Sequence, residues 1–195
     1  MEVLSTRINS LPASATLAMA AKARELKNKG IDIIGLSLGE PDFNTPEFIK
    51  EAAINAVNEN WNSYSPVDGY ADLKEAICEK FKRDNNLDYK SSQIVVSTGA
   101  KQSIANLCLV LLDPGDEVLL PAPYWVSYSA IATLAEATSS IIPSYIENDF
   151  KITPEQLEAA ITPKTKLIMF NSPNNPSGTV SVSYTHLTLP TKRIV

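Results

Sequence analysis

The feature that most constrains the fold is an alternation of short apolar runs with helical segments in the second half of the chain. The apolar runs predict four β-strands, at residues 93–97, 117–120, 138–142 and 166–170. Helical patterns lie between them, and Thr153 is placed to cap the last helix. Strands joined by helical crossovers pair in parallel. The sequence therefore predicts an α/β fold with a mostly parallel sheet.

The first half of the chain predicts an N-terminal helical segment. Helical patterns cover three stretches, at about 14–29, 45–60 and 71–85. Ser14 and Thr45 are placed to cap the first two helices, with Pro46 at the first helical position of the second. A short buried strand is expected at 31–38.

Composition and charge exclude several classes of function. Of the 195 residues, 44% are hydrophobic and 20% are charged, as in soluble globular proteins. The net charge of -5 argues against non-specific nucleic-acid binding, and no apolar run is long enough to predict a membrane span or a signal peptide. The two cysteines, Cys78 and Cys108, form no CxxC or metal-type cluster. Buried unpaired thiols suit a cytoplasmic protein.

The last residues do not continue the strand–helix rhythm. The string from Val182 to Thr191 resembles a translated sequencing adapter of transposase-made libraries. We therefore expect residues 181–195 to be a non-native tail, the alternative being a genuine divergent C-terminus.

Four uncommon loops follow predicted strands, where open parallel sheets bind ligands. Gly99-Ala100-Lys101 opens a helix and can cradle a phosphate, or is an ordinary turn. Trp125 closes the segment 121–125 and is either core or a platform for a flat ring. The segment 171–178 combines two prolines with three asparagines, whose X-Pro bonds can be cis. Gly39, in the segment 37–43, can offer its N–H to a carboxylate or simply lies in a turn.

Taken together, these loops resemble one family. The motifs that carry the resemblance are GEPDF at 39–43, YSP at 64–66, GAKQ at 99–102, DPGDEV at 113–118, PYW at 123–125 and SPNNPSG at 172–178. In this order they resemble fold-type I aminotransferases that depend on pyridoxal 5'-phosphate, in particular the bacterial aspartate aminotransferase subgroup. The resemblance covers residues 1–180 and implies an incomplete large domain of that fold.

The resemblance implies which residues bind the cofactor. Trp125 resembles the aromatic residue that stacks on the pyridine ring, and Asn175 the amide that bonds its phenolic oxygen. Gly99, Ala100 and Lys101 resemble part of the phosphate site.

It also implies substrate and subunit contacts. Gly39 resembles the backbone contact for the α-carboxylate of the amino acid substrate, and Trp125 and Asn175 resemble residues that also contact this substrate. Lys101 resembles a residue that meets the side-chain carboxylate of aspartate. Tyr64 resembles the tyrosine that reaches the cofactor phosphate of a neighbouring subunit, which implies a homodimer. The implied partners are an amino acid and a 2-oxo acid, with no nucleic acid or membrane.

The catalytic groups of this family follow the segment 171–178. Among them is the lysine, in a Ser-x-x-Lys motif, that holds the cofactor as a Schiff base, and no such motif occurs in this sequence. We therefore predict no catalytic residue here and an inactive chain, cut off before that lysine. We predict residues 1–45 to contribute to the small domain and site cover, 46–180 to form a partial cofactor-binding domain and 181–195 to be the tail. The alternative is a non-catalytic chain with weak phosphate or cofactor binding.

Overall fold

The computed structural model describes residues 3–36 and 38–181, so all but the first residue of the predicted tail lies outside the described residues. The chain forms two compact units. The first combines the residues up to Leu11 with those from Ser97 onward, and the second spans Pro12–Val96. The domain limits predicted from the sequence stay a prediction.

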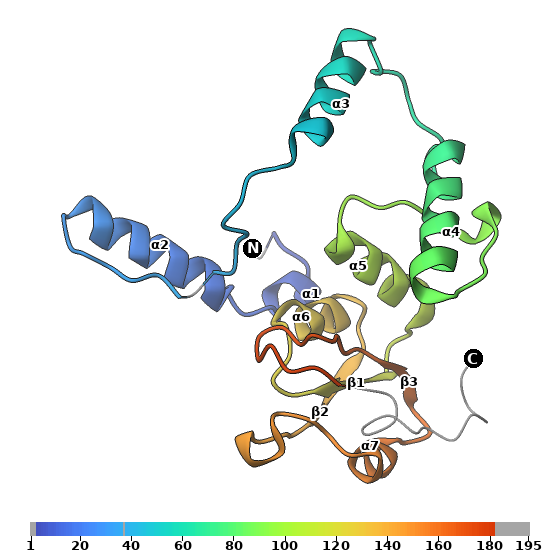
Figure 1. Cartoon of the computed structure of the whole chain (residues 1–195). Coiled ribbons are helices and arrows are strands. Elements are labelled where there is room, and N and C mark those ends of the chain that lie inside the picture. The colour runs from blue at the N-terminus through green and yellow to red at the C-terminus, as the bar shows by residue number, and fades with distance from the viewer. Residues whose placement is uncertain (1–2, 37, 182–195) are drawn as a thin grey trace. The chain divides into compact units, whose positions relative to one another are not determined.

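The first unit contains a three-stranded parallel sheet (Figure 1). Its strands are β1 (Glu117–Pro121), β2 (Thr138–Ile142) and β3 (Thr165–Ile168), in the order β2-β1-β3. Leu119 at the centre of β1 aligns with Ser140 on one side and Ile168 on the other. This arrangement confirms the predicted α/β class and the parallel direction of the strands.

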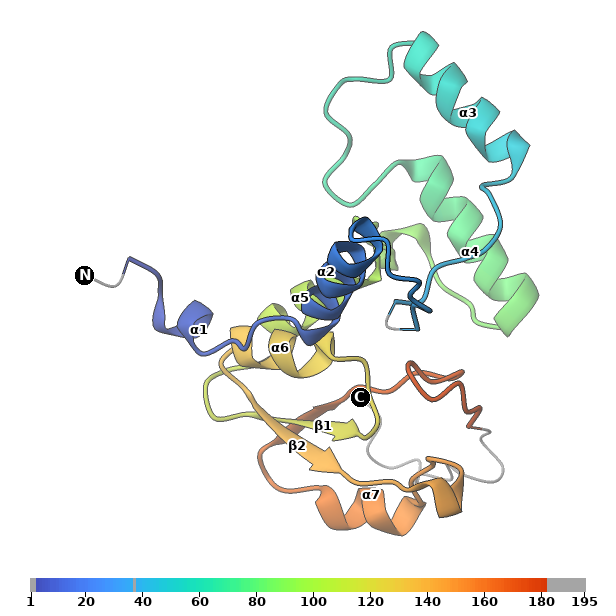
Figure 2. The ribbon, with the colours of Figure 1, turned by 90° about the vertical axis from the view of Figure 1, so that its left-hand side faces the viewer.

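Helices cover both faces of this sheet. Figure 2 shows α6 (Ser127–Leu134) and α7 (Pro154–Ala160) on opposite sides of it. Val118 and Leu120 of β1 pack into a cluster with α6 and α5 (Ala100–Leu111), whereas Leu119 packs with Leu157 of α7. Alternate residues of a strand point to opposite faces, so one short apolar run supplies both cores.

Local capping explains two of the helices in this unit. Thr153 and Gln156 exchange side-chain bonds with each other's backbone N–H groups, which forms the capping box that starts α7. Ser5 caps the short helix α1 (Thr6–Asn9), because its hydroxyl accepts a bond from the Ile8 N–H. This helix packs on α6, and Arg7 lies 3.8 Å from Glu136, just after α6. A 3-10 turn, η2 (Ile146–Asn148), follows β2.

The second unit is helical among its described residues. Its elements are α2 (Ala15–Asn28), α3 (Glu47–Asn58), α4 (Ala71–Asn85) and the 3-10 turn η1 (Ser91–Gln93). Ser14 caps α2 as predicted, because its hydroxyl accepts a bond from the Leu17 N–H. The end of the unit is tied to its middle, since the Val96 N–H donates to the Asp68 carbonyl at 3.0 Å.

Three sequence predictions are wrong in this unit. Residues 93–97 contain the last residue of η1 and four residues without regular secondary structure instead of a strand, and the described residues of 31–38 form no strand either. Both stretches have strand-like composition, but neither is paired with another strand among the described residues, and a strand needs such a neighbour to bond its backbone. Thr45 does not cap α3, because Pro46 is the N-cap residue and makes no side-chain bond.

Two serines of the first unit predict opposite effects on stability. The Ser139 hydroxyl on β2 is buried without a hydrogen-bond partner among the described residues, whereas the Ser144 hydroxyl donates to the Ala122 carbonyl. We expect Ser139→Ala to leave the free energy of unfolding unchanged or raise it by up to about 1 kcal/mol, and Ser144→Ala to lower it by about 1 kcal/mol. Urea unfolding of both variants tests this, and equal destabilisation would contradict it.

Candidate cofactor site

The N-terminus of α5 offers free backbone donors. Gly99, the N-cap residue, has φ +86°, a left-handed value that favours glycine, and provides no side-chain cap. The N–H groups of Ala100 and Lys101 donate to no acceptor among the described residues. Unpaired donors and the helix dipole both favour an anion at this position.

Trp125 lies beside this helix end. The ammonium group of Lys101 is 5.0 Å from the centroid of the Trp125 ring, a cation–π contact. Tyr128 of α6 meets the same ring edge-on, with centroids 5.6 Å apart and planes at 83°. Burial raises the pKa of the Tyr128 hydroxyl above its ordinary value. The indole is therefore held in place by a cation and a second aromatic ring.

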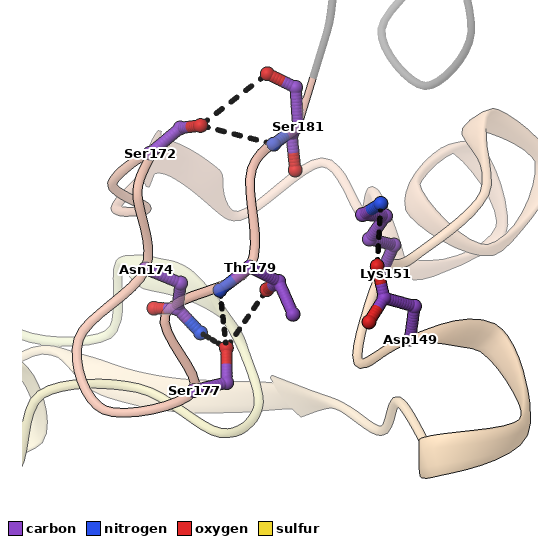
Figure 3. A network of polar contacts seen from close by, with 7 residues as sticks. All are labelled: Asp149, Lys151, Ser172, Asn174, Ser177, Thr179 and Ser181. Atoms are coloured by element: carbon purple, nitrogen blue, oxygen red, sulfur yellow. Dashed lines mark hydrogen bonds and ion pairs between the residues drawn. The ribbon is translucent and has the colours of Figure 1, made fainter.

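The segment 171–178 follows β3 and lies at the same edge of the sheet as the loop after β1, because the two strands are parallel neighbours. It closes on itself through a network that Figure 3 shows. In this network the Asn174 amide donates to the Ser177 hydroxyl at 2.9 Å. A backbone bond from the Asn174 N–H to the Thr179 carbonyl, at 2.8 Å, closes the same turn. The X-Pro bonds before Pro123, Pro173 and Pro176 are cis, which confirms the expectation for this segment.

A hollow opens between these loops and the segment after η2. It is lined by Pro121, Pro123, Tyr124, Tyr128, Phe150, Lys151, Ile152, Ile168, Phe170, Asn171, Asn174, Thr179 and Ser181. Lys151 is paired with Asp149 at 2.7 Å, as Figure 3 shows, so its charge is neutralised within the protein. The hollow is mostly apolar and lies next to Trp125 without including it.

The structure brings some of the predicted site residues together. Gly99, Ala100, Lys101 and Trp125 lie in one cluster, and Asn175 lies in a segment tied to the loop of Trp125. Gly39 and Tyr64 belong to the second unit, where both are exposed.

Two residues at the site were not predicted from the sequence. Tyr128 could have been found from its position three residues after Trp125, at the start of a helix. Asn174 is part of the quoted SPNNPSG motif, but nothing in the sequence distinguishes its role from that of Asn175.

These residues fit a phosphorylated aromatic cofactor. Pyridoxal 5'-phosphate carries a phosphate, which suits the free N–H groups of Ala100 and Lys101, and a flat ring, which suits Trp125. A Cβ atom built at Gly99 would meet no atom within 4 Å, so the approach to the helix end is open. Among residues 3–36 and 38–181, no group of three or more His, Cys, Asp or Glu side chains is placed to hold a metal ion.

The fold and this cluster define an α/β protein in which free backbone N–H groups at a helix N-terminus lie beside an aromatic ring. Comparison with known proteins identifies the family. The family model described as aminotransferase class I and II matches residues 31–184. The chain belongs to the class I and II aminotransferases. None of the described helices is long and apolar enough to cross a membrane.

Curated relatives carry more specific names. A probable aspartate/prephenate aminotransferase of Rickettsia bellii is 52% identical over 186 residues, which is 95% of this chain and 46% of that protein. The aspartate aminotransferase of Bacillus subtilis is 53% identical over 175 residues, which is 90% of this chain and 44% of that protein. The chain thus spans less than half the length of these relatives.

Solved structures agree with the fold. The aspartate aminotransferase of Rhizobium meliloti is similar with a TM-score of 0.88 and 44% identity, covering 93% of this chain and 46% of that one. The Thermus thermophilus aspartate aminotransferase with maleate gives a TM-score of 0.87 and 44% identity, covering 90% and 46%. These neighbours establish the fold as that of fold-type I aminotransferases.

Proposed function

We propose that this chain supplies the cofactor-binding part of an aminotransferase that moves an amino group between an L-amino acid and 2-oxoglutarate. The cofactor is pyridoxal 5'-phosphate, which acts as an electron sink for the amino acid's α-carbon. The observation that carries the proposal is the cluster at the start of α5, where unpaired N–H groups lie beside the Lys101–Trp125 contact. Asn175 would bond the phenolic oxygen of the cofactor.

Aspartate is the amino donor that we propose. Lys101 supplies a cation at the site, which suits a second carboxylate on the substrate. Gly39 would bind the α-carboxylate through its N–H. The names of the relatives support this donor, and one similar structure is described with maleate, a dicarboxylate.

Prephenate is a second candidate for the 2-oxo acid. The specific support is that several relatives at 50–53% identity are named aspartate/prephenate aminotransferase or probable aspartate/prephenate aminotransferase. The rate at which the whole enzyme transfers the amino group from aspartate to 2-oxoglutarate or to prephenate distinguishes the two candidates.

We further propose that the whole enzyme is a cytoplasmic homodimer, with Tyr64 reaching the neighbouring subunit. These 195 residues alone would not transaminate, because the Ser-x-x-Lys motif that the chemistry requires is not among them. Binding of the cofactor without turnover is the behaviour that we expect from this chain.

The test is binding of pyridoxine 5'-phosphate, which has the ring and the phosphate of the cofactor but no aldehyde to react with the 13 lysines. We expect it to bind more tightly than either pyridoxine or inorganic phosphate in equilibrium dialysis. Trp125→Ala should weaken binding by about fivefold or more, because a ring stack contributes about 1 kcal/mol beyond the area that it buries. The control, Trp61→Phe, changes the tryptophan of the second unit and should have no effect. The proposal fails if pyridoxine 5'-phosphate binds no better than inorganic phosphate.

A further inference from the structure

Two neighbouring asparagines in the segment 171–178 have different surroundings. Asn175 is exposed, and its amide makes no hydrogen bond to a described residue. Asn174 is half-buried, and its amide donates to the backbone oxygen of Pro123 and to the Ser177 hydroxyl, both at 2.9 Å. An amide has two N–H groups, so both donors of Asn174 are engaged inside the protein.

We propose that Asn174 is a positioning residue, whose amide sets the spacing between the loop that carries Trp125 and the loop that carries Asn175. The acceptor, Pro123, precedes Trp125 by two residues, and Asn174 directly precedes Asn175. Few rotatable bonds therefore separate this hydrogen bond from either side chain. The proposal rests on the proposed function, since the spacing matters only if both side chains face one ligand.

The other hydrogen bonds of this segment do not reach the loop that carries Trp125, so they cannot set the spacing between the two loops. The Gly178 N–H donates to the Asn174 carbonyl at 2.7 Å, and the Ser172 hydroxyl bonds the backbone of Ser181. Figure 3 shows that the side-chain contacts from Ser172 to Ser181 close the segment on itself. Among described residues 121–126 and 171–181, the bond from Asn174 to Pro123 is the hydrogen bond that joins the two loops.

The substitutions separate this bond from the remaining network. Asn174→Asp keeps the shape of the side chain but replaces the donating NH2 group with an acceptor oxygen, and Asn174→Ala removes both bonds. The control is Ser172→Ala in the same segment, because among the described residues that hydroxyl forms hydrogen bonds only with the backbone of Ser181, at 2.9 and 3.3 Å. All variants carry Trp61→Phe, which leaves Trp125 as the single tryptophan of the chain.

Three quantities are measured on each variant: acrylamide quenching of Trp125 fluorescence, the dissociation constant for pyridoxine 5'-phosphate and the urea unfolding midpoint. We expect both Asn174 variants to show increased quenching and about two- to tenfold weaker binding, the range that one lost hydrogen bond gives. Ser172→Ala should show the same quenching and the same dissociation constant as the chain that carries Trp61→Phe alone. A merely structural role would lower the midpoint and leave the quenching of the folded chain unchanged.

The outcomes distinguish this proposal from the proposed function. If both Asn174 variants match Ser172→Ala in quenching, the positioning role is overturned, whether or not the ligand binds. If the background itself does not bind pyridoxine 5'-phosphate, the proposed function fails, and the quenching comparison alone decides the role of Asn174. Should Asn174→Ala fail to fold, the same comparison is made with Asn174→Asp, which preserves the volume of the side chain.

Discussion

Leu120→Ala is expected to lower the free energy of unfolding by about 2–5 kcal/mol, the usual range for a buried leucine truncated to alanine. Leu120 is 0% exposed and lies on β1, the central strand of the sheet. Its side chain packs in the cluster that joins β1 to α5 and α6. Because neighbours lie on every side of it, the surroundings cannot collapse easily into the space that the substitution leaves.

The matched control is Leu109→Ala on α5, the same chemical change at a side chain that is 62% exposed. It should change the free energy of unfolding by no more than about 0.5 kcal/mol. Urea unfolding followed by Trp125 fluorescence, in the Trp61→Phe background, measures both variants. Similar losses at the two positions would show that the sheet does not form the core of this unit.

The second large effect is expected at Gly69→Ala in the other unit. Gly69 has φ +100°, and a Cβ atom there would lie 2.6 Å from Cγ2 of Val96 and 2.8 Å from its Cβ. The strain of a left-handed residue and the overlap with Val96 each contribute about 1–3 kcal/mol. We therefore expect Gly69→Ala to lower the free energy of unfolding by about 2–6 kcal/mol. Urea unfolding monitored by the fluorescence of Trp61 measures this, since Trp61 contacts Tyr70 with ring centroids 5.6 Å apart.

Gly30→Ala isolates the steric part of that effect. Gly30 also has a positive φ, +77°, but a Cβ atom there would meet nothing within 4 Å. Gly30→Ala should lower the free energy of unfolding only by the strain of the left-handed backbone, about 1–2 kcal/mol. Val96→Ala combined with Gly69→Ala should recover part of the difference, because it removes the Cγ2 atom that is in conflict. Equal losses for the two single glycine variants would refute the close approach to Val96.

Local signals in the sequence predicted the elements that depend on local bonds. Ser14 caps α2 and Thr153 caps α7 because each hydroxyl bonds a backbone N–H three residues away, which the spacing alone indicates. The three strands of the sheet were found from their apolar runs, and parallel pairing followed from the helices between them.

Predictions that depend on distant partners were less successful. Residues 93–97 have strand-like composition, yet Val95 is 69% exposed and the segment is not paired with a strand among the described residues. Composition reports the preference of a segment but not whether a neighbour is available to bond its backbone. The same reason explains why Asn174 was missed, since its acceptor lies 51 residues away in the sequence.

The two cysteines have a consequence for experiments on this protein. Cys108 is 0% exposed in the core of the first unit, where burial raises the pKa of its thiol, whereas Cys78 is half-buried on α4 of the second unit. Only a thiolate reacts readily with disulfide reagents, so Cys108 becomes modifiable when its core opens. Each unit thus contains one natural chemical label, and the time course of Cys108 modification reports the local opening of the first unit.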